Sequence, residues 1–256
     1  MYSSLVSEED KMYFDIKDLI KFYYDTNLGK RTTLSLNRTL NHLFDCGKSE
    51  IVLGFGFTTP LIKSYVDNSI RTISLMPGLQ GAMTWPESRN NINALVEETL
   101  WPIETETVDT AILLHGLEMS LNPPKLLSEV WRVLKPNGIV LIFVPNRAGF
   151  WARSDITPFG YGRPYSSNQL ASLLFETKFE IDKSVFTMNS IPAENSRAVN
   201  IPNTATYILN LANIQVFSGV IAVRASKAIF APEKLKTNYF EFGSHKITRS
   251  GRFVGT

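Results

Sequence analysis

The spacing of hydrophobic and polar residues changes once along the chain, near Glu50, and this change predicts the order of the elements. Residues 15–44 carry apolar side chains at helical spacing with an interruption at Asn27-Leu28-Gly29, which predicts two helices joined by a turn. After residue 50, short apolar runs alternate with amphipathic segments. Runs without polar alternation are typical of strands covered on both faces. We expect such strands at 51–53, 72–75, 109–114 and 139–144, and a weaker one at 92–96.

One strand–helix–strand unit is especially well marked. The apolar residues of PPKLLSEVWRVLKPNG follow helical spacing, Pro123 and Pro124 suit the first turn, and Pro136-Asn137-Gly138 ends the helix. Strands joined through such a helix by short connections indicate a βαβ unit and therefore a parallel sheet. Further along we expect a helix at 168–177, a strand at 179–186, a helix at 204–213 and a last strand at 218–224.

Composition and charge restrict the classes of function. The formal net charge is +2 with Lys and Arg scattered along the chain, so we expect no nucleic-acid partner. No segment approaches the ~18 uninterrupted apolar residues of a membrane span. Acidic residues 8–10 stand where a signal peptide would be basic, so we expect a soluble, cytoplasmic protein without a membrane partner. The single Cys46 excludes an internal disulfide, and the three histidines lack metal-site spacing, so we expect no metal.

The stretch IVLGFGFTTP (51–60) ends the first predicted strand with two glycines one residue apart. Gly54 and Gly56 would let the backbone approach a ligand closely. Thr59-Pro60 would start a helix whose N-terminus attracts a carboxylate or phosphate. In open parallel sheets, ligands bind beyond the carboxyl ends of the strands. The pattern lacks the lysine of a phosphate-binding loop and the full dinucleotide fingerprint, and by itself it fits a plain turn equally well.

A longer stretch, residues 101–146, resembles the class I S-adenosylmethionine-dependent methyltransferases, in particular the type 11 methyltransferases. The resemblance rests on Trp101-Pro102, Val108-Asp109, His115-Gly116-Leu117-Glu118, Arg132-Val133-Leu134-Lys135-Pro136-Asn137-Gly138 and Val144-Pro145-Asn146, and it spans roughly residues 50–187. It implies a three-layer α/β/α Rossmann-like fold with a seven-stranded, mostly parallel sheet and an antiparallel last strand. That domain would cover 47–230, after a helical N-terminal cap at 1–46 and before a polar, flexible tail at 231–256.

The same resemblance implies methyl transfer from S-adenosylmethionine to a small molecule, with S-adenosylhomocysteine as product. It assigns a cofactor-binding role to Gly54, Phe55, Gly56, Met76, Pro77, Glu97, Glu98, His115 and Gly116, with Leu75 and Thr99 beside them. His115 is also the candidate catalytic base. Candidate substrate residues are Tyr23, Tyr24, Arg147, Trp151, Arg153, Tyr161 and Arg163, since aromatic and arginine side chains suit a planar or anionic substrate. For His115 and for the aromatic residues of this set, packing in the core is the alternative role.

Three positions depart from the family pattern. Val52 and Met76 stand where the family carries acidic residues, and Thr58 replaces the third glycine of the first motif. The carboxylate missing at Met76 would bind the ribose, and its loss would weaken the cofactor about ten- to a hundredfold. These departures support an alternative in which the chain is a catalytically inactive binding or scaffold protein. A nucleic-acid methyltransferase is a third alternative, based on the aromatic and arginine loop and the basic tail.

Overall fold

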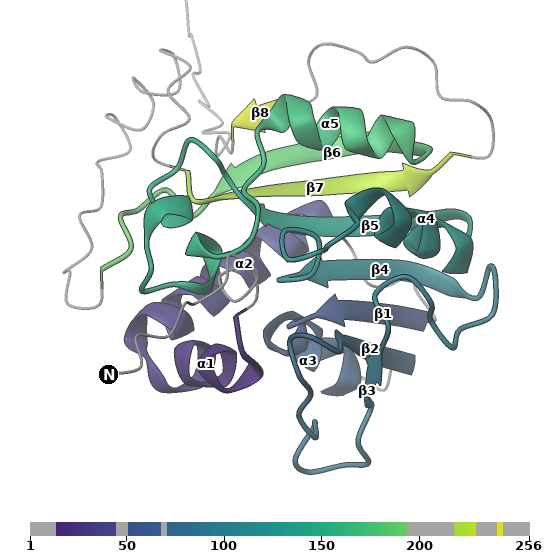
Figure 1. Cartoon of the computed structure of the whole chain (residues 1–256), viewed down its shortest axis with the longest axis horizontal. Coiled ribbons are helices and arrows are strands. Elements are labelled where there is room, and N and C mark those ends of the chain that lie inside the picture. The colour runs from purple at the N-terminus through teal and green to yellow at the C-terminus, as the bar shows by residue number, and fades with distance from the viewer. Residues whose placement is uncertain (1–13, 45–50, 68–70, 194–217, 229–239, 243–256) are drawn as a thin grey trace, which may run out of the picture.

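A single twisted sheet organises the chain (Figure 1), whose computed structural model describes residues 14–44, 51–67, 71–193, 218–228 and 240–242. The strand order is β3-β2-β1-β4-β5-β7-β6-β8. The strands are β1 (Ile51–Gly56), β2 (Arg71–Pro77), β3 (Asn93–Val96), β4 (Val108–Leu114), β5 (Leu134–Pro145), β6 (Phe179–Thr187), β7 (Val220–Lys227) and β8 (Phe240–Phe242). Strand β7 runs antiparallel to β5 and β6, and the other paired strands are parallel.

The predicted seven-stranded sheet with its antiparallel last strand is therefore confirmed, in the order β3 to β6. The eighth strand, β8, was not predicted. It lies within the segment predicted as a polar tail and pairs in parallel with β6. The helix predicted at 204–213 and most of the 231–256 segment lie outside the described residues.

Helices cover both faces of the sheet because successive strand residues point to opposite sides. Ile112 and Leu114 of β4 join a buried cluster with α1 (Ile16–Ile20), α2 (Asn27–Leu43) and α3 (Thr59–Asp67). The alternate β4 residues join a second cluster with α4 (Pro123–Val133) and α5 (Ser167–Glu176). Figure 1 shows α4 and α5 in front of the sheet and α2 behind it.

The N-terminal helices break at a different residue from the predicted one. A π-helical turn (Lys21–Asp25) follows α1, and the break is at Thr26, whose extended backbone and hydroxyl cap α2 by accepting from the Gly29 N–H at 2.9 Å. Gly29 lies inside the first turn of α2. A Cβ on Gly29 would collide with the Phe22 carbonyl, so this glycine serves close packing and does not form the turn.

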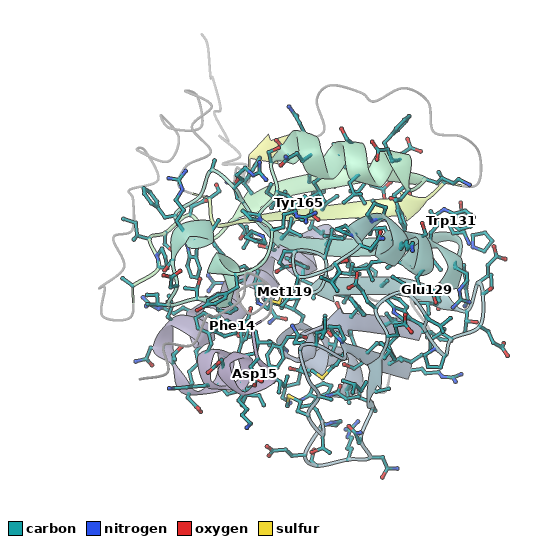
Figure 2. The ribbon with its side chains drawn as sticks, viewed as in Figure 1. Phe14, Asp15, Met119, Glu129, Trp131 and Tyr165 are labelled. Carbon is teal, nitrogen blue, oxygen red and sulfur yellow. The ribbon has the colours of Figure 1, made fainter. Side chains whose placement is uncertain are left out.

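Several residues that carry the family resemblance stabilise the fold. The Asp109 carboxylate accepts from the Ile51 N–H and from Lys135 Nζ, each at 2.8 Å, and so connects β1, β4 and the start of β5. Glu129 (Figure 2) accepts from the Trp101 N–H at 2.8 Å and pairs with Arg132 at 2.7 Å. These contacts hold the loop before β4 against α4.

Candidate functional site

A cavity of about 560 Å³ opens at the carboxyl ends of β2 and β3, beside the start of α4. Ligands of parallel α/β sheets bind at this edge, beyond the strand ends. The lining residues come from three short segments of the chain. They are Pro77, Gly78, Leu79, Leu95, Val96, Glu97, Glu98, Thr99, Leu121, Asn122 and Lys125.

Of the predicted cofactor residues, Pro77, Glu97 and Glu98 line this cavity, together with the neighbouring Thr99. Glu97 is exposed, so its carboxylate is available to a ligand. The Glu98 carboxylate is already engaged, because it accepts from the Ser120 hydroxyl and from the Leu121 N–H at 3.1 Å. Glu98 therefore holds the loop that follows β4, while Glu97 is the acidic group presented to the cavity.

The end of β2 does not present a side chain for a ribose. Met76 is completely buried in the cluster beneath the N-terminal helices, and Leu75 is buried in the cluster on the opposite face. Met76, predicted to lie beside the cofactor, therefore does not line the cavity, whereas the next two residues, Pro77 and Gly78, do.

The glycine turn after β1 packs tightly against the end of β4. Gly56 has φ of +84°, and a Cβ there would collide with the Leu114 carbonyl oxygen and lie 2.9 Å from the Gly116 nitrogen. The Thr58 side chain occupies the space above Gly54, and its hydroxyl is buried without a hydrogen-bond partner. Because Gly54 and Gly56 have no side chains, Thr58 and the end of β4 can pack directly against the backbone of this turn.

The other two predicted residues of this region are also packed. The Phe55 ring stacks on Trp101 with centroids 4.9 Å apart. A Cβ on Gly116 would lie 2.7 Å from the Phe55 ring, so Gly116 makes room for it. Neither residue lines the cavity at the end of β2.

His115 lies at the centre of a buried polar chain. Its Nδ1 is 3.1 Å from Glu118 Oε1 and its Nε2 is 2.7 Å from the Tyr23 hydroxyl. Because a carboxylate only accepts, Nδ1 donates to Glu118 and Nε2 accepts from Tyr23. The side chains of His115 and Glu118 are both fully buried. Burial raises the pKa of the Tyr23 hydroxyl well above its ordinary value, and the Glu118 charge raises it further.

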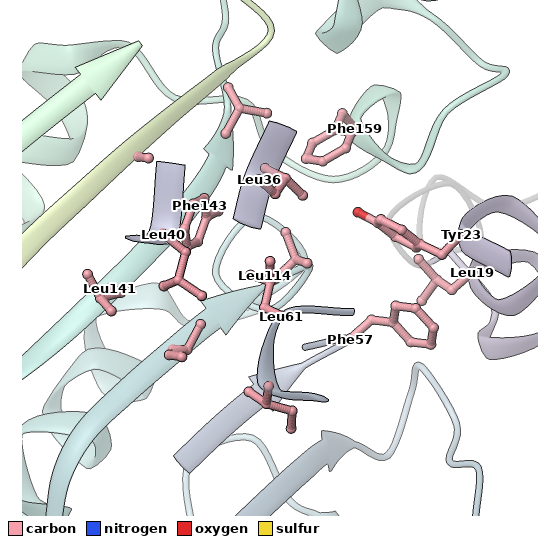
Figure 3. Close-up of a cluster of buried hydrophobic side chains, with 14 of the residues drawn as sticks. Leu19, Tyr23, Leu36, Leu40, Phe57, Leu61, Leu114, Leu141, Phe143 and Phe159 are labelled. Carbon is pink, nitrogen blue, oxygen red and sulfur yellow. The ribbon is translucent and has the colours of Figure 1, made fainter. Parts of the chain in front are cut away.

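Aromatic rings surround this polar chain. Tyr23 stacks on Phe57 with centroids 5.4 Å apart, and Phe159 lies 4.7 Å from the His115 ring. Figure 3 shows the Tyr23 ring entering from the N-terminal helices between Phe159 and Phe57. The arrangement isolates the imidazole from solvent.

The predicted substrate residues separate into two groups. Trp151 is buried, donates from Nε1 to the Ser190 carbonyl at 2.5 Å and packs edge-on against Phe159. Tyr161 packs edge-on against Phe14 (Figure 2) with centroids 4.6 Å apart. The exposed residues are Tyr24, Arg147, Arg153 and Arg163. The structure thus brings Tyr23 and Trp151 into the aromatic surroundings of His115, while the three arginines stay at the surface.

Sequence reasoning missed the apolar side of the cavity and the partner of His115. Leu79, Leu95 and Leu121 line the cavity although each is more than half exposed, and the sequence carries no signal that separates exposed leucines from buried ones. Glu118 belongs to the quoted His-Gly-Leu-Glu motif, where its spacing from His115 was the signal. Its second carboxylate oxygen and the Tyr165 hydroxyl (Figure 2) are buried without hydrogen-bond partners.

Two negative results concern the described residues alone. Within them, no helix is long and apolar enough to cross a membrane. The same part of the chain holds no group of three or more His, Cys, Asp or Glu side chains that could bind a metal ion.

Comparisons with known proteins agree with this architecture. A family model described as a methyltransferase domain matches residues 50–142. An S-adenosylmethionine-dependent methyltransferase from Thermotoga maritima is similar in structure, with a TM-score of 0.57, 15% identity, and 83% of this chain and 95% of that chain covered. Similar proteins from Archaeoglobus fulgidus (TM-score 0.59, 17% identity, 83% and 100% covered) and Aquifex aeolicus (0.55, 16%, 84% and 100%) share the fold. No curated protein sequence matches the chain.

The family match covers β1 to most of β5, and the structural similarity to the Archaeoglobus fulgidus protein covers 83% of the chain. All three solved proteins are described as S-adenosylmethionine-dependent methyltransferases. The family match and the three solved structures together show that the chain has a methyltransferase fold.

Proposed function

We propose that the protein transfers the methyl group of S-adenosylmethionine to a small molecule, and that the cavity at the ends of β2 and β3 takes the adenosine end of the cofactor. The observation that carries this proposal is the position of the cavity beyond parallel strand ends, next to the exposed carboxylate of Glu97. Its volume of about 560 Å³ lies within the range of small-molecule sites, roughly 300–1,000 Å³.

The chemistry of the cavity suits an adenosine. Leu79, Leu95 and Val96 offer apolar surface to a flat ring, and the Glu97 carboxylate can accept a hydrogen bond from an amine. A ribose finds no carboxylate at the end of β2, because Met76 is buried beneath the N-terminal helices. Since a hydrogen bond to a charged group contributes about 1.5–3 kcal/mol, we expect affinity about ten- to a hundredfold below that of a complete site.

His115 is the group that would move a proton during the reaction. The cofactor supplies an electrophilic methyl group, and proximity to the acceptor does much of the remaining work. Hydrogen bonding of Nδ1 to Glu118 leaves Nε2 as the nitrogen that accepts a proton from an acceptor O–H or N–H. In the structure this nitrogen accepts from the Tyr23 hydroxyl at 2.7 Å, so a methyl acceptor reaches it only after that hydroxyl has moved away.

A second function is supported by the other end of the site. Thr58, Phe55 and Tyr23 fill the region around the glycine turn and His115, where the amino-acid end of the cofactor would lie. With Val52 and Met76 in place of acidic residues, this packing favours a catalytically inactive protein that binds adenosine-like ligands.

Calorimetric titration with S-adenosylhomocysteine tests the proposal. Gly78→Leu is the informative variant, because a Cβ at Gly78 meets only the Val96 carbonyl oxygen at 3.9 Å, so the larger side chain can fill the cavity without a backbone clash. We expect it to abolish binding, and Glu97→Gln to weaken binding about tenfold. Glu104→Gln, an exposed acidic residue away from the cavity, is the matched control and should bind like the wild type. No heat at millimolar ligand with folded wild-type protein would reject the enzyme function.

A further inference from the structure

The side chain of Tyr23 closes the part of the site that lies around His115. It comes from the π-helical turn Lys21–Asp25, and only 2% of its surface is exposed. Its hydroxyl takes the hydrogen-bonding position on His115 Nε2, and its ring covers Phe57 in the glycine turn after β1. The Tyr23 side chain thus covers both His115, the candidate base, and the glycine turn after β1.

We propose that Tyr23 is an internal stopper: its side chain occupies the space that the amino-acid end of the cofactor needs. Tyr23 must move away from His115 before that end can bind. This inference rests on the proposed function, since it assumes that adenosine enters the cavity at β2 and β3. The closed protein would then accept adenosine but exclude the remainder of S-adenosylmethionine.

Unpartnered polar atoms beside His115 and in the glycine turn after β1 point to a missing polar ligand. Glu118 Oε2, Gln80 Oε1 and the Thr58 hydroxyl are buried without hydrogen-bond partners. Glu118 and Gln80 both contact His115 through their other polar atoms, at 3.1 and 2.9 Å. Buried polar groups are normally hydrogen-bonded, and each exception costs about 1–3 kcal/mol. An ammonium and a carboxylate, the charged groups of the cofactor's amino-acid end, are suitable partners for two acceptors and a hydroxyl.

Gln80 connects the cavity to the stopper. It follows the cavity-lining residues Pro77–Leu79, its carbonyl accepts from the Ile16 N–H at 3.0 Å, and its amide donates to the His115 carbonyl at 2.9 Å. A ligand in the cavity therefore touches the loop to which α1 is attached. The cavity and the segment that carries Tyr23 are therefore joined through one loop.

The segment that carries Tyr23 is short and has an irregular backbone. Helix α1 has five residues, the turn that follows it is π-helical, and Thr26 ends that turn with extended backbone. Single π-helical turns are rare and occur frequently at functional sites. The closed position depends on the hydrogen bond between Tyr23 and His115 and on aromatic packing.

Tyr23→Phe removes the hydrogen bond and keeps the packing. A hydrogen bond of this kind shifts an equilibrium about three- to tenfold, and the apparent affinity of a ligand scales with the fraction of protein that can accept it. We expect S-adenosylhomocysteine to bind Tyr23→Phe about three- to tenfold more tightly than the wild type. Adenosine, which lacks the amino-acid end, should bind both proteins equally.

The experiment is a calorimetric titration of both ligands into wild type, Tyr23→Phe and Tyr65→Phe, with thermal melting to verify folding. Tyr65 is the matched control, a buried tyrosine of α3 that packs against Phe44. Equal or weaker binding of S-adenosylhomocysteine to Tyr23→Phe, with adenosine unaffected, would overturn the stopper but leave the cavity assignment intact. An equal gain in affinity for S-adenosylhomocysteine in Tyr65→Phe would also overturn the stopper, because it would show that the gain comes from general loosening of the core. Absence of binding by either ligand in all three proteins would reject the proposed function, and the stopper with it.

Discussion

Gly56 and Gly78 give a sharp test of how the site is built, because the same substitution should have opposite consequences at the two positions. Gly56 has φ of +84°, and an added Cβ would collide with the Leu114 carbonyl oxygen in the neighbouring strand β4. Gly78 lacks both features, since its Cβ would meet only the Val96 carbonyl oxygen at 3.9 Å. Gly56→Ala tests a position inside the sheet, and Gly78→Ala tests one at the cavity.

The cost at Gly56 has two parts. A non-glycine residue at positive φ costs about 1–3 kcal/mol. Overpacking a tightly packed site costs about another 1–3 kcal/mol, because strands β1 and β4 must separate slightly. We expect Gly56→Ala to lower the free energy of unfolding by about 2–6 kcal/mol. Gly78→Ala should lie between no change and a gain of about 1 kcal/mol, since alanine restricts the unfolded chain.

Urea unfolding followed by circular dichroism measures the free energy of unfolding of both variants. The slope of that free energy with urea concentration should equal the wild-type slope. In thermal melting, Gly56→Ala should lose several degrees, at roughly 2–4 °C per kcal/mol for a chain of this size. Gly56→Ala within 0.5 kcal/mol of the wild type would refute the argument that this glycine serves the β1–β4 contact. Substitutions at Gly56 are consequently unsuitable for mapping a ligand, and Gly78 is the position to use.

Two further predictions concern buried and paired charges. Asp109→Asn should lower the free energy of unfolding by about 1 kcal/mol, because it weakens the contact with Lys135 but retains an acceptor for the Ile51 N–H. The difference from the wild type should shrink in 1 M salt, and urea unfolding at two salt concentrations measures it. Burial and the Glu118 charge raise the pKa of Tyr165 to about 12, above its ordinary value near 10, so stability should fall between about pH 10 and pH 12 as the unfolded chain ionises first. Tyr165→Phe should remove that part of the pH dependence, and at pH 7 it should be more stable than the wild type by about 1–3 kcal/mol, since it removes a buried hydroxyl that has no hydrogen-bond partner. A wild type and variant with parallel pH curves would contradict this account.

Much of the scaffold could be predicted from local patterns. The βαβ unit around α4 followed from its apolar spacing and prolines, and the observed helix Pro123–Val133 confirms it. The family resemblance in residues 101–146 is carried partly by Asp109, Lys135 and Arg132, whose contacts hold strands and helix together. These residues are informative about the fold because each contributes to an arrangement that the fold requires.

Part of the site could also be predicted. Pro77 and Glu97 line the cavity because the parallel pairing of β2 with β3 brings their carboxyl ends to one edge, and both strands were predicted from the pattern. The same reasoning could not tell that the Glu98 carboxylate is engaged by the loop after β4. That contact joins segments separated by more than twenty residues, and periodicity contains no information about it.

The sequence by itself determined the order of the predicted helices and strands and the parallel sheet, because alternating burial, capping residues and motif spacing are properties of neighbouring residues. Only the tertiary structure decided that Tyr23 bonds to His115, 92 residues further along, and that Gly56 packs against β4. The physical reason is that side chains from distant segments meet only after the sheet has formed. Whether a glycine turn is open to a ligand or closed by a tyrosine depends on how those segments pack.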